Sequence, residues 1–257
     1  MKTFFKELKK VVPIKPTLLE GFPGLGYVGK ITISYMIKQL SAKKFAELYS
    51  PYFPHHVITN LRGGARLPRA ELYFWKNPVG ERDLIFLTTD TQAQTVQGQY
   101  EVVDNFLTYA KKKGVTQVVS IGGFSSQVQK DSPSVVCVST SKKLLDEALR
   151  AGARISPVGN PIVGLAGLTL GLARFKGIDA LCILGETAGH MPDPAVSKNV
   201  LQVIQRFLSV DFDLKPLDKE IERVIKTLKE MENIQQKMDG VMKKSLELDL
   251  KKTTYIA

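Results

Sequence analysis

The chain has 257 residues, 44% of them apolar, and a formal net charge of +11 from 36 Lys and Arg against 25 Asp and Glu. This length suffices for one large domain or for a domain with an appendage. No apolar run reaches the roughly 18 residues of a membrane-spanning helix, and the charged first residues predict no secretory signal. Because the basic residues are scattered and not interleaved with aromatic ones, we expect a solvated surface, with no nucleic-acid or membrane partner.

The cysteines and histidines give no sign of a metal or redox site. Cys137 and Cys182 each lie in a short apolar run typical of a core strand, so we expect buried free thiols and a cytoplasmic protein. The three histidines are His55, His56 and His190, and no C-x-x-C or H-E-x-x-H pattern occurs. We therefore expect no metal and no other cofactor.

A glycine-rich segment, Gly21–Gly29 with the sequence GFPGLGYVG, is the first strong local signal. Apolar residues precede it, and apolar residues at helical spacing follow it, which predicts a strand over 17–22, a tight turn and a helix over 27–40. Glycine permits left-handed angles and close backbone contacts, while Pro23 stiffens the turn.

Three of these glycines, Gly24, Gly26 and Gly29, also spell the dinucleotide-binding pattern G-x-G-x-x-G. That chemistry needs an acid at the end of the second strand, roughly 20 residues on, to hold a ribose. Glu47 stands near that distance but inside a predicted strand. Close packing of strand against helix explains the same glycines, so a nucleotide site and a purely structural turn both stay open.

The middle of the chain alternates between strand and helix patterns. After the turn we expect strands over 45–49 and 57–59, a hairpin of strands over 71–75 and 83–88, a helix over 96–113 closed by Gly114, and a strand over 115–121.

The same alternation continues to residue 208. We expect a strand over 134–138, a helix over 142–150 capped within Ser139–Ser141, a loop over 155–164, a helix over 165–175, a strand over 178–184, and a helix over 194–208 capped by Asp193. Strands that alternate with helices, with a hairpin inserted, predict a three-layer α/β/α fold with a mixed sheet.

The last part of the chain changes to a heptad-like pattern. Its apolar positions are Leu217, Ile221, Val224, Leu228 and Met231, continued by Gln235, Met238 and Met242. The pattern predicts a long helix that either packs on its own domain or meets copies of itself or a partner. We expect an α/β domain over 1–213, this helix over 214–250 and a flexible tail over 251–257.

Candidate catalytic residues follow two predicted core strands. Glu186, His190 and Asp193 follow one strand, and Ser125 and Ser126 follow another, so a Ser–His–acid set could assemble. The G-x-S-x-G pattern of a nucleophile elbow is absent. Cap and turn roles explain the same residues, and we expect no enzyme.

Two blocks of the sequence resemble the proteasome assembly chaperone family, in its archaeal and bacterial branch. The opening signature is carried by Gly21, Pro23, Gly24, Gly26 and Gly29, and the late signature by Gly185, Glu186, Asp193 and Pro194. Between them Asp90-Thr91-Gln92, Ile121-Gly122-Gly123 and Gly164–Leu168 follow in the family's order. The resemblance covers about residues 17–212 and implies a three-layer α/β fold like that of nucleoside phosphorylases.

The resemblance implies a binding protein that forms homo-oligomers and contacts the α-ring of the proteasome core particle. Many members dock through a C-terminal motif of a hydrophobic residue, a tyrosine and one further residue. This chain ends in Tyr255, Ile256 and Ala257, so its tyrosine is one register off that motif. Docking by the tail and an incidental tyrosine both stay open. The alternative function is an enzyme that binds a nucleoside or nucleotide at the glycine-rich turn.

Overall fold

The structure is a computed structural model that describes residues 1–80, 82–125, 134–159, 161–189 and 191–226. The chain divides into two compact units, Met1–Leu214 and Lys215–Ala257. In the second unit, residues 215–226 are helical. The predicted helix over 214–250 and the predicted tail over 251–257 therefore lie largely outside the described residues, and their extents stay predictions.

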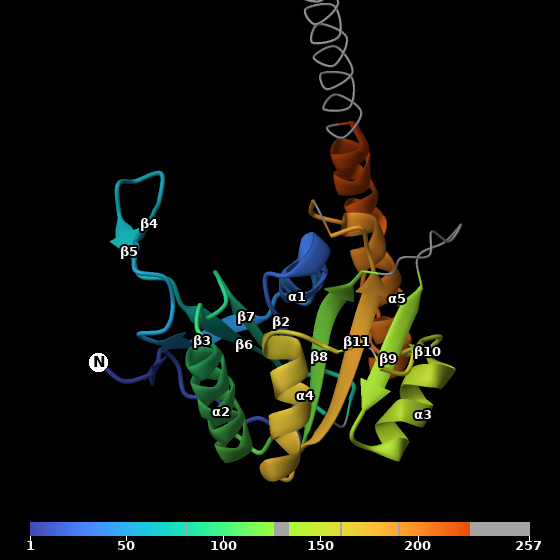
Figure 1. The fold of residues 1–257 in the computed structure, drawn as a ribbon, viewed down its shortest axis with the longest axis horizontal. Coiled ribbons are helices and arrows are strands. Elements are labelled where there is room, and N and C mark those ends of the chain that lie inside the picture. The colour runs from blue at the N-terminus through green and yellow to red at the C-terminus, as the bar shows by residue number, and fades with distance from the viewer. Residues whose placement is uncertain (81, 126–133, 160, 190, 227–257) are drawn as a thin grey trace, which may run out of the picture. The chain divides into compact units, whose positions relative to one another are not determined.

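The first unit is built on one nine-stranded sheet whose middle strand is the first core strand of the chain (Figure 1). In sheet order the strands are β1 (Phe4–Glu7), β3 (Lys43–Tyr49), β6 (Ala70–Trp75), β7 (Leu84–Thr89), β2 (Thr17–Gly21), β8 (Gln117–Phe124), β11 (Asp179–Glu186), β9 (Val135–Ser139) and β10 (Arg154–Ile155). Every residue of β2 is buried, as a central strand with both faces covered requires.

The sheet is mixed, as the sequence predicts. Strands β7, β2, β8 and β11 run parallel to one another, and β10 runs parallel to β9. The pairs β1–β3, β3–β6, β6–β7 and β9–β11 are antiparallel. The predicted hairpin of 71–75 and 83–88 is confirmed as β6 and β7.

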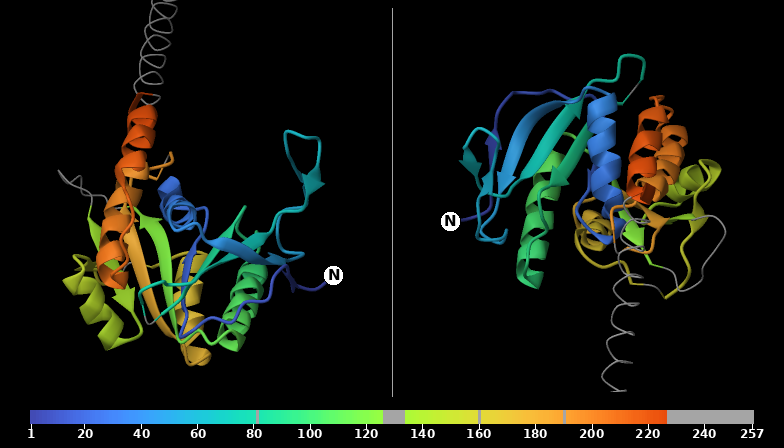
Figure 2. Two further views of the ribbon diagram at one scale, coloured as in Figure 1. Left: turned by 180° about the vertical axis from the view of Figure 1, so that it is seen from behind. Right: turned by 90° about the horizontal axis from the view of Figure 1, so that it is seen from above.

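Helices cover both faces of the sheet, which confirms the three-layer α/β/α fold. The helices are α1 (Val28–Gln39), α2 (Val96–Lys112), α3 (Lys142–Arg150), α4 (Leu165–Phe175) and α5 (Pro194–Leu208), with a short 3-10 turn η1 (Leu25–Tyr27) before α1. Helices α2 and α4 pack together on one face, in front in Figure 1. Helices α1, α3 and α5 cover the other face, which Figure 2 shows from behind.

The core extends on both sides of β2. Leu18 and Leu19 point to opposite faces, and each is at most 1% exposed. Leu18 belongs to the apolar cluster under α2, together with Phe106 of that helix. Cys137 and Cys182 are free and buried in β9 and β11, as predicted. No helix among the described residues combines the length and apolar composition that crossing a membrane requires.

Strand β1 and the start of α3 differ from the sequence predictions. The edge strand β1 was not predicted, because its four residues show no pattern of their own. It forms by pairing with β3 and by stacking of Phe5 on Tyr109, with ring centroids 3.9 Å apart. Ser141 occupies the N-cap position of α3, but its side chain makes no capping hydrogen bond. Its backbone N–H instead donates to the hydroxyl of Ser139.

The segment between β3 and β6 contains a small hairpin that projects from the sheet (Figure 1). Its strands are β4 (Ile58–Thr59), which confirms the predicted short strand, and β5 (Ala65–Arg66). Leu61 is fully exposed in the turn between them. At the base, the Arg66 guanidinium binds Asp90 through two hydrogen bonds of 2.5 and 2.9 Å. We call residues 58–66 the β4–β5 arm.

Candidate functional site

The two signature blocks, far apart in the sequence, are packed directly against each other. The N–H of Asp193 donates to the carbonyl of Gly26 at 2.8 Å. A Cβ atom at Gly26 would lie 2.6 Å from the hydroxyl of Thr187, and one at Gly189 would lie 2.7 Å from Leu25. The opening and late signatures therefore form one structural unit, at the edge of the sheet where the parallel strands end.

Most of the signature glycines are required by this packing. A Cβ atom at Gly21 would lie 2.2 Å from the carbonyl oxygen of Gly29, and one at Gly29 would lie 2.2 Å from that of Ile121. Gly26 has a φ of +59°, a left-handed conformation that favours glycine. At Gly185 a Cβ atom would lie 2.3 Å from the side chain of Val196. These contacts explain Gly21, Gly26, Gly29 and Gly185 without a phosphate.

The polar signature residues hold the ends of strands and helices. Asp193 caps α5, because one carboxylate oxygen accepts from the N–H of Val196 at 3.0 Å, and Pro194 follows at the first helical position. The other oxygen accepts from the hydroxyl of Thr187 at 2.8 Å. Glu186 accepts from the N–H and the hydroxyl of Ser134, which joins the end of β11 to the start of β9.

Two of the candidate catalytic residues, Glu186 and Asp193, use their carboxylates in the structural contacts just described. A third, Ser125, directly follows β8 and lines a pocket. Ser126 and His190 lie outside the described residues. Within those residues no group of three or more His, Cys, Asp or Glu side chains could hold a metal ion.

The dinucleotide interpretation also needs an acid beside the glycine-rich turn. The sheet order places β6 and β7 between β2 and the strand of Glu47. Glu47 instead accepts from Lys44 at 2.9 Å and forms an ion pair with Arg69 at 3.0 Å. Burial alone would raise the pKa of Glu47, but hydrogen bonds from Lys44 and Tyr49 and the charge of Arg69 outweigh it and lower the pKa. Glu47 therefore does not lie beside the glycine-rich turn, where a ribose-binding acid would have to be.

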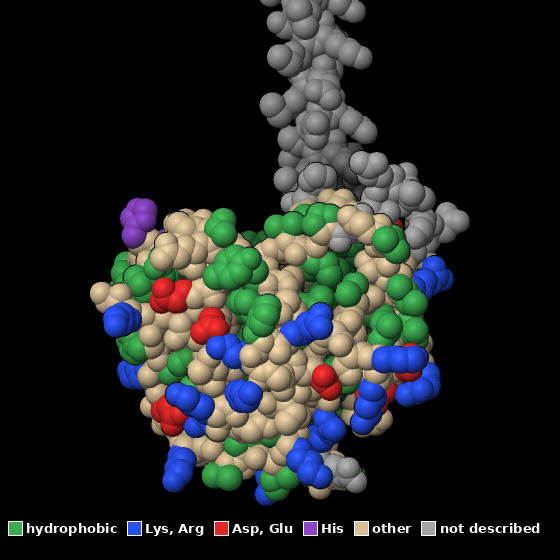
Figure 3. All heavy atoms as spheres, turned by 60° about the horizontal axis from the view of Figure 1, so that its bottom comes forward, with side chains coloured by type: hydrophobic (Ala, Val, Ile, Leu, Met, Phe, Trp, Pro, Cys, Tyr) green, Lys and Arg blue, Asp and Glu red, His purple; other side chains and the backbone are tan. Residues whose placement is uncertain are grey.

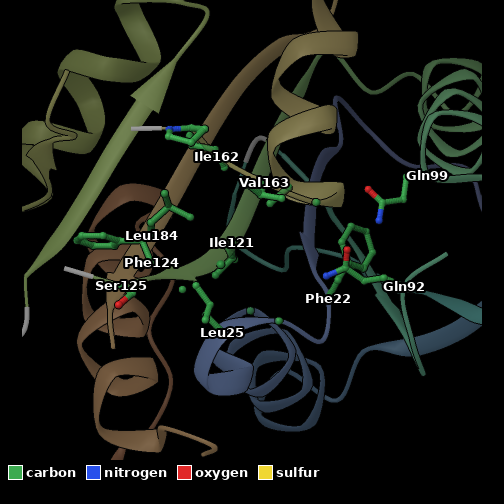
Figure 4. Close-up of a pocket in the computed structure, with 17 residues that line it drawn as sticks. Phe22, Leu25, Gln92, Gln99, Ile121, Phe124, Ser125, Ile162, Val163 and Leu184 are labelled. Carbon is green, nitrogen blue, oxygen red and sulfur yellow. The ribbon is translucent and has the colours of Figure 1, made fainter. Parts of the chain in front are cut away.

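A pocket of about 620 Å³ opens where β2, β8 and β11 end (Figure 4). Its lining includes Phe22, Gly24 and Leu25 from the turn, Gln92 and Gln99 from the segment after β7, Ile121–Phe124 from β8 and the following Ser125, 161–164 and Ala166 around the start of α4, and Leu184 from β11. We call it the switch-point pocket. It lies beside a topological switch point, because β2 leads to α1 on one face and its neighbour β7 to α2 on the other. Such crevices are the usual ligand sites of open α/β sheets.

Gln92 connects two walls of this pocket. Its side-chain N–H donates to the carbonyl of Pro23 at 2.5 Å, and its side-chain oxygen accepts from the N–H of Leu165 at 3.3 Å. Leu165 is the first residue of α4, whose N-cap Gly164 has no side chain to do this. Gln92 therefore fixes the glycine-rich turn against the start of α4.

Glu20 lies in β2 with its side chain completely buried, and sequence analysis did not single it out. Ser120 donates a hydrogen bond to one of its oxygens, while the other oxygen finds no partner among the described residues. Burial raises the pKa of Glu20 to about 8, against the lowering effect of the hydrogen bond from Ser120. The sequence feature that could have identified Glu20 is an acidic residue in a predicted core strand, directly after Leu18 and Leu19.

The predicted helix face is described only in part. Leu217, Ile221 and Val224 lie within the helical residues 215–226, at spacings of four and three that place them on one face. Leu228, Met231 and the tail Tyr255–Ala257 lie outside the described residues. On the face of the molecule that Figure 3 presents, Lys and Arg side chains are dispersed among acidic and other residues, as expected for a solvated surface.

Comparisons with known proteins agree with the resemblance found in the sequence. Residues 18–232 match the model of the PAC2 family. The structure is similar to that of Pyrococcus furiosus PbaB, an archaeal proteasome activator, with a TM-score of 0.85 and 31% identity over 90% of this chain and 99% of that one. Pyrococcus furiosus PbaA, an archaeal homologue of proteasome-assembly chaperone, gives a TM-score of 0.75 and 26% identity over 98% and 99% of the two chains. An uncharacterised protein of Methanocaldococcus jannaschii is 29% identical over 90% of each chain.

Proposed function

Because this chain belongs to the PAC2 family, the family of proteasome-assembly chaperones, we propose that it binds α-subunits of the proteasome core particle or their assembly intermediates. The similarity to PbaB carries the proposal, since it extends over 99% of that chain at 31% identity. Both PbaA and PbaB are described by their relation to the proteasome, one as a chaperone homologue and one as an activator. The proposed partner is therefore a proteasome subunit surface.

The second part of the proposal is that the protein acts as a homo-oligomer. The helix that begins at residue 215 carries Leu217, Ile221 and Val224 at heptad spacing, with Leu217 buried and the other two half-buried, and the pattern continues in the sequence with Leu228 and Met231. Such a stripe supports association of helices from several copies or with a partner helix. Charged residues on both sides of the stripe fit a helix that is exposed elsewhere.

The third part concerns the C-terminal tail. Tyr255, Ile256 and Ala257 offer an aromatic ring beside apolar side chains, which can anchor a segment in a pocket between subunits. The PAC2 family groups assembly factors and is not a known family of enzymes. We propose a protein that binds without catalysis or cofactor, in the cytoplasm, with no nucleic acid or membrane as partner.

Co-migration with proteasome subunits tests the proposal. The full chain is mixed with purified α-subunits, and separately with assembled core particle, and each mixture is analysed by size-exclusion chromatography and native mass spectrometry. We expect a complex with α-subunits or core particle, and a weaker complex after removal of Tyr255–Ala257. No complex with either form of the proteasome would contradict the proposal.

A double substitution tests the role of the helix in oligomer formation independently of the tail. Ile221→Glu combined with Val224→Glu places charges in the predicted stripe, and we expect a smaller oligomer by light scattering. Glu222→Gln, beside the stripe, is the matched control and should leave the mass unchanged. A wild-type chain that is monomeric at all concentrations would contradict the oligomer, whatever the outcome with α-subunits.

A further inference from the structure

Two glycines that line the switch-point pocket have no packing reason to be glycine. Gly24 has a φ of −170°, an extended conformation that any residue adopts, and a Cβ atom there would come no closer than 3.7 Å, to the Gln92 side chain. At Gly122 the nearest atom would be the far end of the Leu184 side chain at 3.1 Å, a tight contact that a small movement of this flexible side chain relieves. By contrast, Gly29 and Gly123, which also line the pocket, would each clash with backbone within 2.4 Å. The missing side chains of Gly24 and Gly122 therefore leave space in the pocket and do not serve the fold.

The size and walls of the pocket are those of a small-molecule site. Its volume of about 620 Å³ lies within the range of roughly 300–1,000 Å³ that such sites have. Apolar side chains supply most of the wall, with Phe22, Leu25 and Ile121 around the centre of the view and Phe124 and Leu184 beyond them (Figure 4). A mainly apolar molecule would lose its contact with water there at little cost in polar contacts.

The charge of the pocket limits the ligand further. None of the described residues that line it carries a charged side chain. A phosphate or carboxylate would enter without a counter-charge, and burying an unpaired ion is strongly unfavourable. The lining therefore disfavours nucleotides and other anions and favours uncharged molecules.

The two glutamine side chains that line the pocket determine which hydrogen-bonding group a ligand needs. Both ends of the Gln92 amide are used, by Pro23 and Leu165. Gln99, on α2, donates to the carbonyl of Ala93 at 3.2 Å, and its oxygen accepts nothing from the described residues. Figure 4 shows Gln99 and Ser125 at opposite sides of the lining, with Ile121 between them. The Gln99 oxygen is thus an acceptor, held in place, that an N–H or O–H of a ligand can meet.

We propose that the switch-point pocket binds an uncharged, mainly apolar organic molecule that donates a hydrogen bond to Gln99. The lining residues all belong to the first unit, so the site adds small-molecule binding to the proposed proteasome partner. The two ideas fail independently, because one is tested by a small probe and the other by α-subunits.

Methyl NMR with a pair of matched probes tests this site. Benzamide is uncharged and donates hydrogen bonds, while benzoate has the same ring with a carboxylate. In the full chain labelled at Ile and Leu methyls, we expect benzamide to shift Leu25, Ile121 and Leu184 saturably, with Kd on the order of millimolar. The buried Ile33 and Ile204, under the other face, should not shift, and benzoate and AMP should bind at least about tenfold more weakly because of their charge.

Variants locate the probe. Gly24→Leu places a side chain in the pocket, as does Ala166→Leu on α4, and each should abolish the benzamide shifts. Gly171→Leu, on the same helix with nothing within 4 Å of its added Cβ, is the control and should retain them. Thermal melts confirm that each variant is folded. The proposal is overturned if wild type shows no saturable shift, if benzoate binds as well as benzamide, or if binding survives in both filled variants.

Discussion

Gly21 and Gly29 approach so closely that a Cβ atom on Gly21 would lie 2.2 Å from the carbonyl oxygen of Gly29. This contact seats α1 against the end of β2, and neither backbone can move away, since Gly29 in turn lies against Ile121. Gly21 is therefore a point where strand, helix and the neighbouring strand β8 meet.

Gly21→Ala should lower the free energy of unfolding by about 1–3 kcal/mol, because the added methyl group meets backbone that has no room to shift. Gly24→Ala, in the same turn, is the matched control and should change it by less than about 1 kcal/mol, as its Cβ atom has room. Urea denaturation of both variants makes the comparison. Equal losses would show that the turn needs glycine for another reason.

Asp193→Ala should cost about 1–2 kcal/mol, because α5 loses the acceptor for the Val196 N–H and Thr187 loses its partner. Asp193→Asn keeps one acceptor oxygen and should recover most of the loss. Ser141→Ala, at the N-cap of α3, should be nearly neutral, since that side chain makes no capping bond. The prediction fails if the two alanine variants are equally destabilised in thermal melts.

The raised pKa of Glu20 predicts that the folded protein becomes less stable as the pH rises. The folded carboxyl has a pKa of about 8 and the unfolded one an ordinary value near 4.5, so between these values the folded state holds a proton that the unfolded state has released. The free energy of unfolding should therefore decrease by up to about 1.4 kcal/mol per pH unit in that window, and level off above pH 8.

Glu20→Gln removes this titration. Its stability relative to wild type should increase from pH 5 to pH 8, as urea denaturation across that range would show. Glu47→Gln is a comparison with the opposite sign, because the pKa of Glu47 is lowered and its contribution grows as pH rises through the acidic range. A constant difference between wild type and Glu20→Gln from pH 5 to pH 8 would contradict the assignment.

Arg66→Met should loosen the β4–β5 arm without unfolding the rest. The two hydrogen bonds from Arg66 to Asp90 hold the base of a two-stranded hairpin, and isolated hairpins are marginally stable in water. Amide exchange in residues 58–66 should become about tenfold faster, while exchange in β2 and β8 stays unchanged. Arg62→Met, in the exposed turn, is the control and should leave exchange in the arm as it is.

The sequence was sufficient for most of the architecture because its signals are local. Helix α1 was predicted from its apolar residues at helical spacing, and Gly114 marked the end of α2, where the structure gives it a left-handed φ of +86°. Strand β1 was not predicted, because its existence depends on pairing with β3 and on the ring of Tyr109, which lie far away in the chain.

The candidate site was predicted less completely. The two signature blocks were found as sequence patterns, but nothing local shows that Asp193 meets Gly26. The distinction between Gly24 and Gly21 is also invisible in sequence, since both stand in one run of glycines and differ only in what surrounds their missing side chains. Gln92 and Gln99 entered the site because the crossover of β7 to α2 brings them to the end of β2.

The central place of β2 has a consequence for how the protein is made. Ribosomal synthesis delivers β2 and α1 first, yet their partners β7, β8 and α5 come later, and the Tyr35 hydroxyl reaches its acceptor, the Asp213 carbonyl, across 178 positions. The nascent chain must carry β2 without its partner strands until β7 and β8 have been translated, and α1 without α5 until nearly all of the first unit has been made. A protein proposed to assist the assembly of others thus exposes first its own middle strand and then the apolar face of α1 during its synthesis, and chains that stop before α5 should be insoluble.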